Sequence, residues 1–381
     1  MQNSIIPLYK QIDALIVKGK DCHLYDANGR RYIDFESGDW AACLGHSNDR
    51  VSRVLKNQAD SLIHDGLRFR NTQSEDLSAR LLKLLSFADG KSVFLSSGSE
   101  AVNLGIMIAR NLSGRSKILN MDCSFLSSYG YGQISENNTD LISIPMDDVN
   151  ALSQIDFQAI AAFAFEPGNA RGLIKFPTNE FIQSIASAVK QNNGFLIANE
   201  VTTGFGRTGK WFGFQHYDFH PDIVSMGKGL GNGYPVSCVS ITRDVAALFD
   251  GKPFRYAQSH QNDPLGCAVG LEVVNTLVEM DLIRRSSDMG RYFAGELAGL
   301  KAKHAGKIKD IRARGLMLAL ELDSSIDAEK IYSQLIENGL LVGWRENVLR
   351  FMPPLVIEKS HIDKLIQTMD SLLAAEIPPR T

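Results

Sequence analysis

Lys228 is the residue whose surroundings point most directly to chemistry. It stands between Gly227 and Gly229, directly after the apolar segment 222–226, which we predict to be a short strand. Glycines at a strand end let the backbone approach a ligand closely, and a lysine amine in such a loop is accessible as a nucleophile. Lysine usually lies in solvent, so on its own Lys228 is better interpreted as a solvated surface residue. The polar residues at other predicted strand ends decide between the two interpretations.

A second polar loop follows the apolar residues 196–198, which we predict to be the end of a buried strand. Asn199, Val201 and Thr202 come directly after that strand, and glycines break the loop from position 204 onward. In an open parallel sheet, ligands bind beyond the carboxyl ends of the strands. We therefore expect the residues from Asn199 to Thr202 to point toward a ligand.

A third polar turn, at residues 96–100, connects the predicted strand 93–95 to a helix that carries apolar residues from position 101 to 109. The first turn of a helix offers free backbone N–H groups at the positive end of the helix dipole, so Gly98 and Ser99 could bind a phosphate group. The same residues also fit a simple helix cap, with Ser97 as N-cap and Glu100 in the first turn. Both interpretations remain open at this point.

The elements that must position these loops alternate along the chain. Strands predicted at 118–120, 160–165 and 196–198 alternate with helices, which is typical of a doubly wound α/β fold with a mostly parallel sheet. Polar residues at several strand ends, including Glu166, would meet at one edge of it. Towards the C-terminus, the helices 265–277, 328–338 and 361–375 and the strands 311–322 and 348–351 predict a smaller α+β unit.

The N-terminal part contributes a hairpin and a loop. Residues 23–35 fit two short strands on either side of an Asn28-Gly29 turn, which is a strong signal for an antiparallel hairpin. The glycine-broken loop 37–40 ends in Trp40, which either lines a pocket or packs within its own loop. Helices are predicted at 49–59 and 74–85.

Composition narrows the class of protein. The chain has 381 residues and a formal net charge of −3, without a sustained basic run, so nucleic acid is not an expected partner. We find neither an apolar run of about 20 residues nor a signal peptide. The five cysteines are scattered and show no paired spacing, which predicts a reducing, cytoplasmic setting.

A phosphate-binding turn, an amine on a glycine loop and an aromatic residue at Phe125 together fit pyridoxal phosphate, a flat, phosphorylated aldehyde held as an imine. A substrate amine would displace Lys228, which would then act as the base that moves the proton at the substrate carbon. His216 and His220 are four residues apart, but Pro221 follows at once and no third ligand is evident, so no metal site is expected.

Residues 199–209, Asn-Glu-Val-Thr-Thr-Gly-Phe-Gly-Arg-Thr-Gly, resemble the Asp-Glu-Val-Gln-Thr-Gly-Phe-Gly-Arg-Thr-Gly segment of the class III (ornithine and acetylornithine type) pyridoxal-phosphate aminotransferases of fold type I. Residues 221–235, which contain Lys228, are similar to the segment with that family's Schiff-base lysine. The resemblance extends from about residue 21 to 355. It implies a fold type I domain at 46–255, a small domain at 256–381, and a segment 1–45 that packs with the small domain.

The resemblance also implies roles for single residues. Lys228 would form the imine, and Gly98 and Ser99 would bind the phosphate. Phe125 and Val201 would contact the two faces of the ring. Ser259 matches a threonine that reaches the phosphate in a partner subunit, which implies a homodimer with shared active sites. Arg350, in Arg-Phe-Met-Pro-Pro-Leu, matches an arginine that binds a substrate carboxylate.

The chain departs from the family pattern at positions around the cofactor and the substrate. Asn199 replaces the aspartate that faces the ring nitrogen, which predicts a weaker electron sink. Thr202 replaces a glutamine near the ring hydroxyl. Glu166-Pro167 matches the family, but Arg171 replaces a second glutamate that shields the carboxylate-binding arginine in many members. Ser128 replaces an arginine of the acetylornithine enzymes, which argues against donors of that type.

Three functions are compatible with these residues. The first is an aminotransferase acting on a small amino compound and a 2-oxo acid such as 2-oxoglutarate, with Trp40, Glu166, Arg171 and Arg350 near the substrate. The second keeps the cofactor but shifts an amino group internally or epimerises an amino acid, which the change at Asn199 motivates. The third is a non-catalytic binding protein that retains the fold, against which Lys228 argues.

Overall fold

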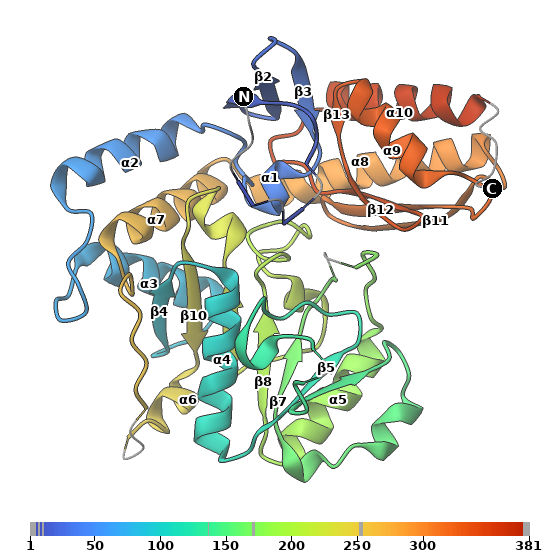
Figure 1. Cartoon of the computed structure of the whole chain (residues 1–381). Coiled ribbons are helices and arrows are strands. Elements are labelled where there is room, and N and C mark those ends of the chain that lie inside the picture. Colours follow the sequence, from blue (N-terminus) through green and yellow to red (C-terminus); the bar gives the residue numbers. More distant parts are fainter. Residues whose placement is uncertain are drawn as a thin grey trace.

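A seven-stranded sheet lies in the lower half of the molecule as seen in Figure 1, in the order β4-β10-β9-β8-β7-β5-β6. The computed structural model describes residues 5–6, 8–9, 11–135, 137–169, 172–250 and 254–375. Strand β10 is antiparallel to β4 and β9, whereas β5 to β9 pair in parallel. The predicted α/β fold with a mostly parallel sheet is thus confirmed. Its strands are β4 (Lys91–Leu95), β5 (Lys117–Met121), β6 (Leu141–Ile144), β7 (Ile160–Phe165), β8 (Phe195–Asn199), β9 (Ile223–Met226) and β10 (Ser237–Ile241).

Helices cover both faces of this sheet. In β7, Ala162 and Ala164 pack in the apolar cluster that contains α4 (Gly98–Ser113), and Phe163 and Phe165 pack in the cluster that contains α5 (Asn179–Gln191). Successive side chains of a strand point to opposite faces, so a strand buried on both sides is continuously apolar. This is why residues 160–165 read as one uninterrupted hydrophobic run.

Four further helices complete this half of the molecule. In α3, Leu77, Leu81 and Leu85 are buried on one face, as predicted, and Leu82 is partly buried beside them. Both α2 and α3 pack against α7, which Pro264 begins. Their bounds are α2 (Asp49–Ser61), α3 (Thr72–Leu85), α6 (Arg243–Ala247) and α7 (Pro264–Glu279).

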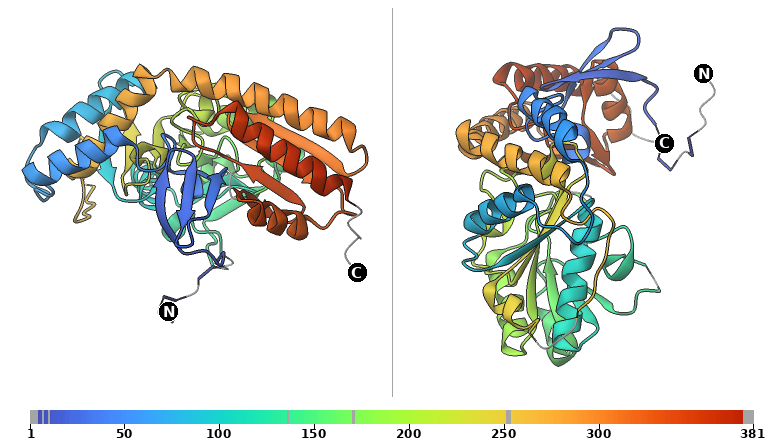
Figure 2. Two further views of the ribbon diagram at one scale, coloured as in Figure 1. Left: turned by 90° about the horizontal axis from the view of Figure 1, so that it is seen from above. Right: turned by 90° about the vertical axis from the view of Figure 1, so that its left-hand side faces the viewer.

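The upper layer contains a four-stranded antiparallel sheet, β11-β12-β15-β14, with α8 and α10 packed side by side against it (Figure 2). We predicted one strand over 311–322, and this is wrong: the chain turns back at Gly315, where φ is +56°, and forms two strands. Helix α8 had no counterpart in the prediction. These elements are α8 (Leu282–Lys303), β11 (Ile308–Arg314), β12 (Met317–Leu322), α9 (Ala328–Glu337), β14 (Gly343–Arg345), β15 (Val348–Phe351) and α10 (Lys359–Ala374).

The N-terminal strands β1 (Ile16–Lys20), β2 (His23–Asp26) and β3 (Arg31–Asp34) form a third sheet with β13 (Leu340–Leu341). Strands β2 and β3 are antiparallel, which confirms the predicted hairpin. Strand β3 pairs in parallel with β13. The division at residues 45 and 255 stays a proposal. No helix in the described part of the chain combines the length and the apolar character needed to cross a membrane.

Candidate active site

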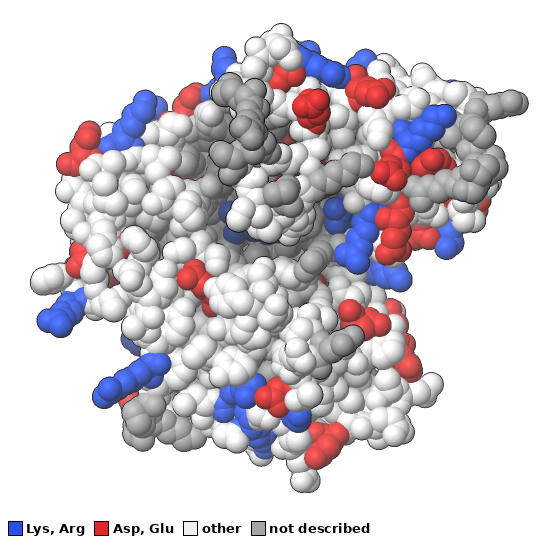
Figure 3. All heavy atoms as spheres, viewed as in Figure 1, with Lys and Arg blue, Asp and Glu red and all other residues white. Residues whose placement is uncertain are grey.

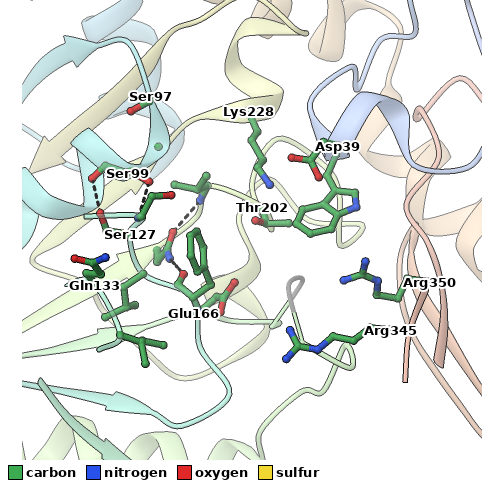
Figure 4. A pocket seen from close by; sticks show the side chains of 18 of the residues that line it. Asp39, Ser97, Ser99, Ser127, Gln133, Glu166, Thr202, Lys228, Arg345 and Arg350 are labelled. Carbon is green, nitrogen blue, oxygen red and sulfur yellow. Dashed lines mark hydrogen bonds between the residues drawn. The ribbon is translucent and has the colours of Figure 1, made fainter. Parts of the chain in front are cut away.

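A cavity of about 1010 Å³ lies where loops from both layers meet, and Figure 4 shows its lining from close by. The carboxyl end of β8, the loop after β9 and the first turn of α4 open into it. The upper layer contributes residues of the turn after β3 and of strands β14 and β15. Among the described residues, the lining includes Asp39, Trp40, Gly98, Ser99, Phe125, Ser128, Glu166, Asn199, Val201, Thr202, Lys228, Trp344, Arg345 and Arg350.

Lys228 points into this cavity from a left-handed backbone position, with φ of +42°. Its Nζ atom lies 3.9 Å from the centre of the Trp40 indole ring. Burial lowers the pKa of the Lys228 amine, although the charges of Asp39, Glu166 and Glu36 act in the opposite direction. A lysine with a lowered pKa is a better nucleophile and base near neutral pH.

Asn199 is buried at the end of β8 and bonded on both sides of its amide group. Its Nδ2 atom donates to the carbonyl oxygen of Phe125 over 3.0 Å, and its Oδ1 atom accepts from the backbone N–H of Val201 over 3.2 Å. A flipped amide would set like groups against each other at both contacts, so these partners fix its orientation. Phe125 is also held by Glu166, whose Oε2 accepts from the Phe125 N–H over 2.8 Å.

Gly98 and Ser99 lie in the first turn of α4. Ser97 and Glu100 form the predicted capping box, which involves their own backbone groups and leaves Gly98 and Ser99 at the cavity. A Cβ atom at position 98 would lie 2.5 Å from Cγ1 of Val201, so only glycine fits there. Ser99 Oγ accepts from the N–H of Ser128 over 3.0 Å. Helix cap and candidate phosphate site are therefore compatible with each other.

The turn that carries Trp40 is left-handed. Ser37, Gly38, Asp39 and Trp40 have φ values of 44°, 59°, 61° and 71°. Each non-glycine residue in this conformation costs roughly 1–2 kcal/mol, and such strain gathers at functional sites. The carboxylate of Asp34 accepts from the N–H groups of Glu36 and Gly38, over 2.7 and 2.9 Å, and so holds the turn in place.

Arg350 and Arg345 reach the cavity from neighbouring strands. Gly343 of β14 pairs with Arg350 of β15, and Arg345 is two residues further along the same face. The Cζ atom of Arg350 lies 5.4 Å from the centre of the Trp40 ring. Burial lowers the pKa of Arg350, while the nearby Glu36 opposes this effect and Arg345 adds to it.

Most of the predicted site residues thus meet in one cavity. Ser259 is exposed and is not among the described residues that line the cavity. Arg171 lies outside the described residues. The prediction missed Glu36, Asp39, Trp344 and Arg345, which line or adjoin the cavity. No sequence signal marked them, because their elements reach the cavity only through the packing of the upper layer.

The side chains of His216 and His220 have different surroundings. His216 Nε2 contacts the carbonyl oxygen and the hydroxyl of Thr208 over 3.0 and 3.1 Å, whereas the His220 side chain is 94% exposed. His64, His260 and Asp263 form a separate group in the described part of the chain. Each of these two histidines bonds one oxygen of Asp263, both over 2.5 Å, and Asp263 stands at the positive end of α7, which disfavours a cation.

Comparison with known proteins agrees with this geometry. Residues 7–128 and 125–373 match the family described as Aminotransferase class-III. The acetylornithine aminotransferase of Caldanaerobacter subterraneus subsp. tengcongensis is 32% identical, with 97% of each chain covered. The ornithine aminotransferase of Geobacillus sp. (strain WCH70) is 30% identical, with 96% of this chain and 95% of the relative covered.

Among solved structures, the ornithine aminotransferase of Toxoplasma gondii, described with partial occupancy of PLP at its active site, superimposes with a TM-score of 0.89 at 27% identity, covering 97% of this chain and 92% of that one. The acetylornithine aminotransferase of Elizabethkingia anophelis gives a TM-score of 0.85, also at 27% identity, covering 97% and 96%. These similarities do not favour the mutase, epimerase or non-catalytic alternatives. The chain belongs to the class III aminotransferases and is a pyridoxal phosphate-dependent enzyme of fold type I.

Proposed function

We propose that this aminotransferase moves an amino group between a small amino compound and a 2-oxo acid such as 2-oxoglutarate, with Lys228 as cofactor-binding residue and base. One observation carries the proposal. The amine of Lys228 and the guanidinium of Arg350 lie against the same Trp40 ring in one cavity. A nucleophile and a carboxylate-binding group thereby lie against one aromatic ring in the same cavity.

The residues around Lys228 fit pyridoxal phosphate. The glycine at position 98, forced by the contact with Val201, leaves the N-terminus of α4 open for a phosphate group, with Ser99 beside it. Phe125 and Val201 supply apolar surfaces for the ring, and Thr202 supplies a hydroxyl near its edge. Bound pyridoxal phosphate supplies an aldehyde that condenses with amines and a ring that withdraws electrons from the substrate carbon.

The protein residues then have separate tasks. Lys228 would hold the cofactor through its amine and, when free, would move the proton at the substrate carbon. Its lowered pKa keeps more of the amine unprotonated for that step. Asn199, at the end of β8, would face the cofactor ring, and Arg350 would bind the substrate carboxylate. Glu166 fixes Phe125 through the backbone hydrogen bond described above.

The donor differs from those of the named relatives in this proposal. Ser128 lines the cavity without a positive charge, and its N–H is already bonded to Ser99. In the sequence, Arg171 stands where the family pattern has a glutamate in many members, which changes the charge at that position. N-acetylornithine and ornithine should therefore be poor donors.

The proposed working form is a homodimer with shared active sites. Residues 62–69 expose Leu62, Ile63, Leu67 and Phe69, and such an apolar segment is a common mark of an interface. Asn71 Nδ2 bonds the carbonyl oxygen of Asn262 over 3.0 Å, which ties this segment to the loop that carries Ser259. Figure 3 shows that much of the surface around the central hollow is uncharged.

Sedimentation equilibrium tests this assembly. We expect the wild type to sediment with twice the mass of the chain, and Phe69→Asp to shift it toward the monomer with loss of activity. A wild-type monomer with full activity would refute the shared site.

We also propose a reducing, cytoplasmic setting, which the five free cysteines support.

Absorbance spectroscopy tests the reaction. Amino compounds are added to the purified holoenzyme, followed by 2-oxoglutarate. The proposal expects one class of donor to bleach the cofactor band and the oxo acid to restore it. A band that neither donor nor oxo acid changes would contradict the proposed substrates, and a protein that takes up no pyridoxal phosphate would contradict the role of Lys228.

A further inference from the structure

The carboxyl group of Glu36 lies beside Arg350 because position 343 has no side chain. A Cβ atom at Gly343 would overlap Oε1 of Glu36 and would lie 3.1 Å from Nε of Arg350. Gly343 is also the β-sheet partner of Arg350. The missing side chain therefore makes room for a carboxyl group of the protein at the arginine to which we assign the substrate carboxylate.

Glu36 is fixed at both ends. Its backbone N–H donates to Asp34 Oδ1 over 2.7 Å, and its Oε1 accepts from the indole N–H of Trp40 over 3.2 Å. Asp34 also bonds His46 Nε2 over 2.7 Å, so the base of the turn is anchored as well. Movement of the Glu36 carboxyl group away from Arg350 would break the contact with Trp40. Protonation of the Glu36 carboxyl group, in contrast, leaves its hydrogen bonds to Asp34 and Trp40 in place.

The surroundings of Glu36 contain several charges from different elements. Burial raises the pKa of the Glu36 carboxyl to about 7, Arg350 and the Trp40 indole act to lower it, and Asp34 and Asp39 add to the rise. The negative charge of Glu36 in turn acts on Arg207, Lys228 and Tyr332. Arg350 is thus the main positive charge that keeps Glu36 ionised.

We propose, as an extension of the function proposed above, that Glu36 and the substrate carboxylate share Arg350 alternately, and that Glu36 takes up a proton from solvent when the substrate carboxylate binds. Two carboxylates would otherwise compete for one partly buried guanidinium. Once the substrate has paired with Arg350, the group that stabilised the Glu36 anion is engaged elsewhere. The charge of the site is then the same before and after binding. Glu36 acts as a positioning residue, through Arg350 and not on the cofactor.

The sign of the pH dependence follows directly. Below pH about 7 Glu36 is already protonated, so a carboxylate ligand binds without proton uptake. Above that pH a proton must be bound, and affinity falls by up to about tenfold per pH unit until the pKa of the bound state is reached. An amine ligand without a carboxyl group does not engage Arg350 and should show no such fall from this source.

Glutarate, a dicarboxylate with no oxo group, tests this without turnover. Its binding to the holoenzyme is measured by titration calorimetry at pH 6 and pH 8, in two buffers that differ in ionisation enthalpy. We expect the wild type to take up close to one proton at pH 8 and almost none at pH 6. In Glu36→Gln the uptake at pH 8 should vanish, and glutarate should bind about five- to tenfold more tightly than to the wild type at pH 8 but equally at pH 6.

Two further variants serve as an alternative test and as a control. Gly343→Ala displaces the Glu36 carboxyl group while leaving it titratable, so it should lower the proton uptake at pH 8. This variant provides the test if Glu36→Gln does not fold. Glu180→Gln changes an exposed glutamate in the first turn of α5 and should behave as the wild type. The same variants are then compared by the pH dependence of KM for 2-oxoglutarate, in which Glu36→Gln should change KM above pH 7 much more than kcat.

Proton uptake that is unchanged in Glu36→Gln, or absent from the wild type at pH 8, overturns the inference, as does a holoenzyme to which glutarate does not bind. Its failure is separable from failure of the proposed function. If the enzyme transfers amino groups to 2-oxoglutarate but takes up no proton with glutarate, only the proposed role of Glu36 is refuted. If it takes up a proton with glutarate but transfers no amino group to 2-oxoglutarate, the role of Glu36 stands and the proposed acceptor is refuted.

Discussion

The amine of Lys228 lies 3.9 Å from the centre of the Trp40 ring, and this contact joins the two layers of the molecule. Lys228 follows β9 of the large sheet, whereas Trp40 belongs to a strained turn between β3 and α2. In its protonated form, a lysine side chain over an indole ring is attracted by about 0.5–2 kcal/mol, depending on its desolvation. The ring thereby helps to hold the lysine at the cavity, together with the nearby charges of Asp39, Glu166 and Glu36.

Replacement of this lysine gives the most direct prediction. Lys228→Ala should lower turnover by at least about 1,000-fold, because it removes both the attachment point and the base. The absorbance band of the lysine-bound cofactor should also disappear. Stopped-flow spectroscopy with the best donor checks both, and turnover close to that of the wild type would refute the role of Lys228.

Asn199→Asp should strengthen the electron sink. A carboxylate at this position keeps the ring nitrogen protonated, so the cofactor band should move to longer wavelength or gain intensity. The same change loses the donor to Phe125 and sets a carboxylate against a carbonyl group, which should cost about 1–3 kcal/mol of stability in the cofactor-free protein. Asn120→Asp, in strand β5 of the same sheet, should reduce stability with no spectral change. An unaltered spectrum in Asn199→Asp would mean that Asn199 does not face the ring nitrogen.

Gly98→Ala should weaken cofactor binding more than it weakens the fold. The added methyl group meets Val201 at 2.5 Å and must push it toward the ring position. Fluorescence titration should show at least about a tenfold higher Kd for pyridoxal phosphate, a loss of about 1.4 kcal/mol. The double variant with Val201→Ala should recover part of it. Gly295→Ala, in open space on α8, should instead stabilise the protein by about 0.5–1 kcal/mol.

His216 should make the protein sensitive to acid. Burial lowers its pKa from 6.5 to about 4, with Arg314 and Lys210 adding to the effect. The unfolded chain therefore binds this proton more readily, so the contribution to stability is present above about pH 6.5 and is lost as the pH falls toward 4. His216→Gln should lose less Tm than the wild type between pH 7 and 4.5, by about 2–4 °C. His220→Gln, at an exposed position, should follow the wild type, and equal curves for all three proteins would contradict the assignment.

Local sequence patterns were sufficient to predict an element wherever neighbouring residues of one segment specify it. The capping box of Ser97 and Glu100, the hairpin around Asn28-Gly29 and the apolar run 160–165 are each set by neighbours in sequence. The turn at Gly315 was missed because residues 311–322 are apolar enough to read as one strand, and only the packing of Gly315 against Thr208 and Gly209 requires the reversal.

The sequence by itself determined the mostly parallel character of the sheet, the position of Lys228 at a strand end, and the glycine loops around it, because strand ends in a parallel sheet meet at one edge whatever packs above them. It did not show strands β6 and β10. Only the tertiary structure decided that Glu36, Asp39 and Arg345 join that edge. They belong to the upper layer, which meets the sheet through contacts between residues more than a hundred positions apart, such as the hydrogen bond from Arg207 Nη2, in the loop after β8, to Ser37 Oγ over 3.1 Å. No periodicity within one segment encodes a contact of that range, since it depends on how two independently formed layers pack.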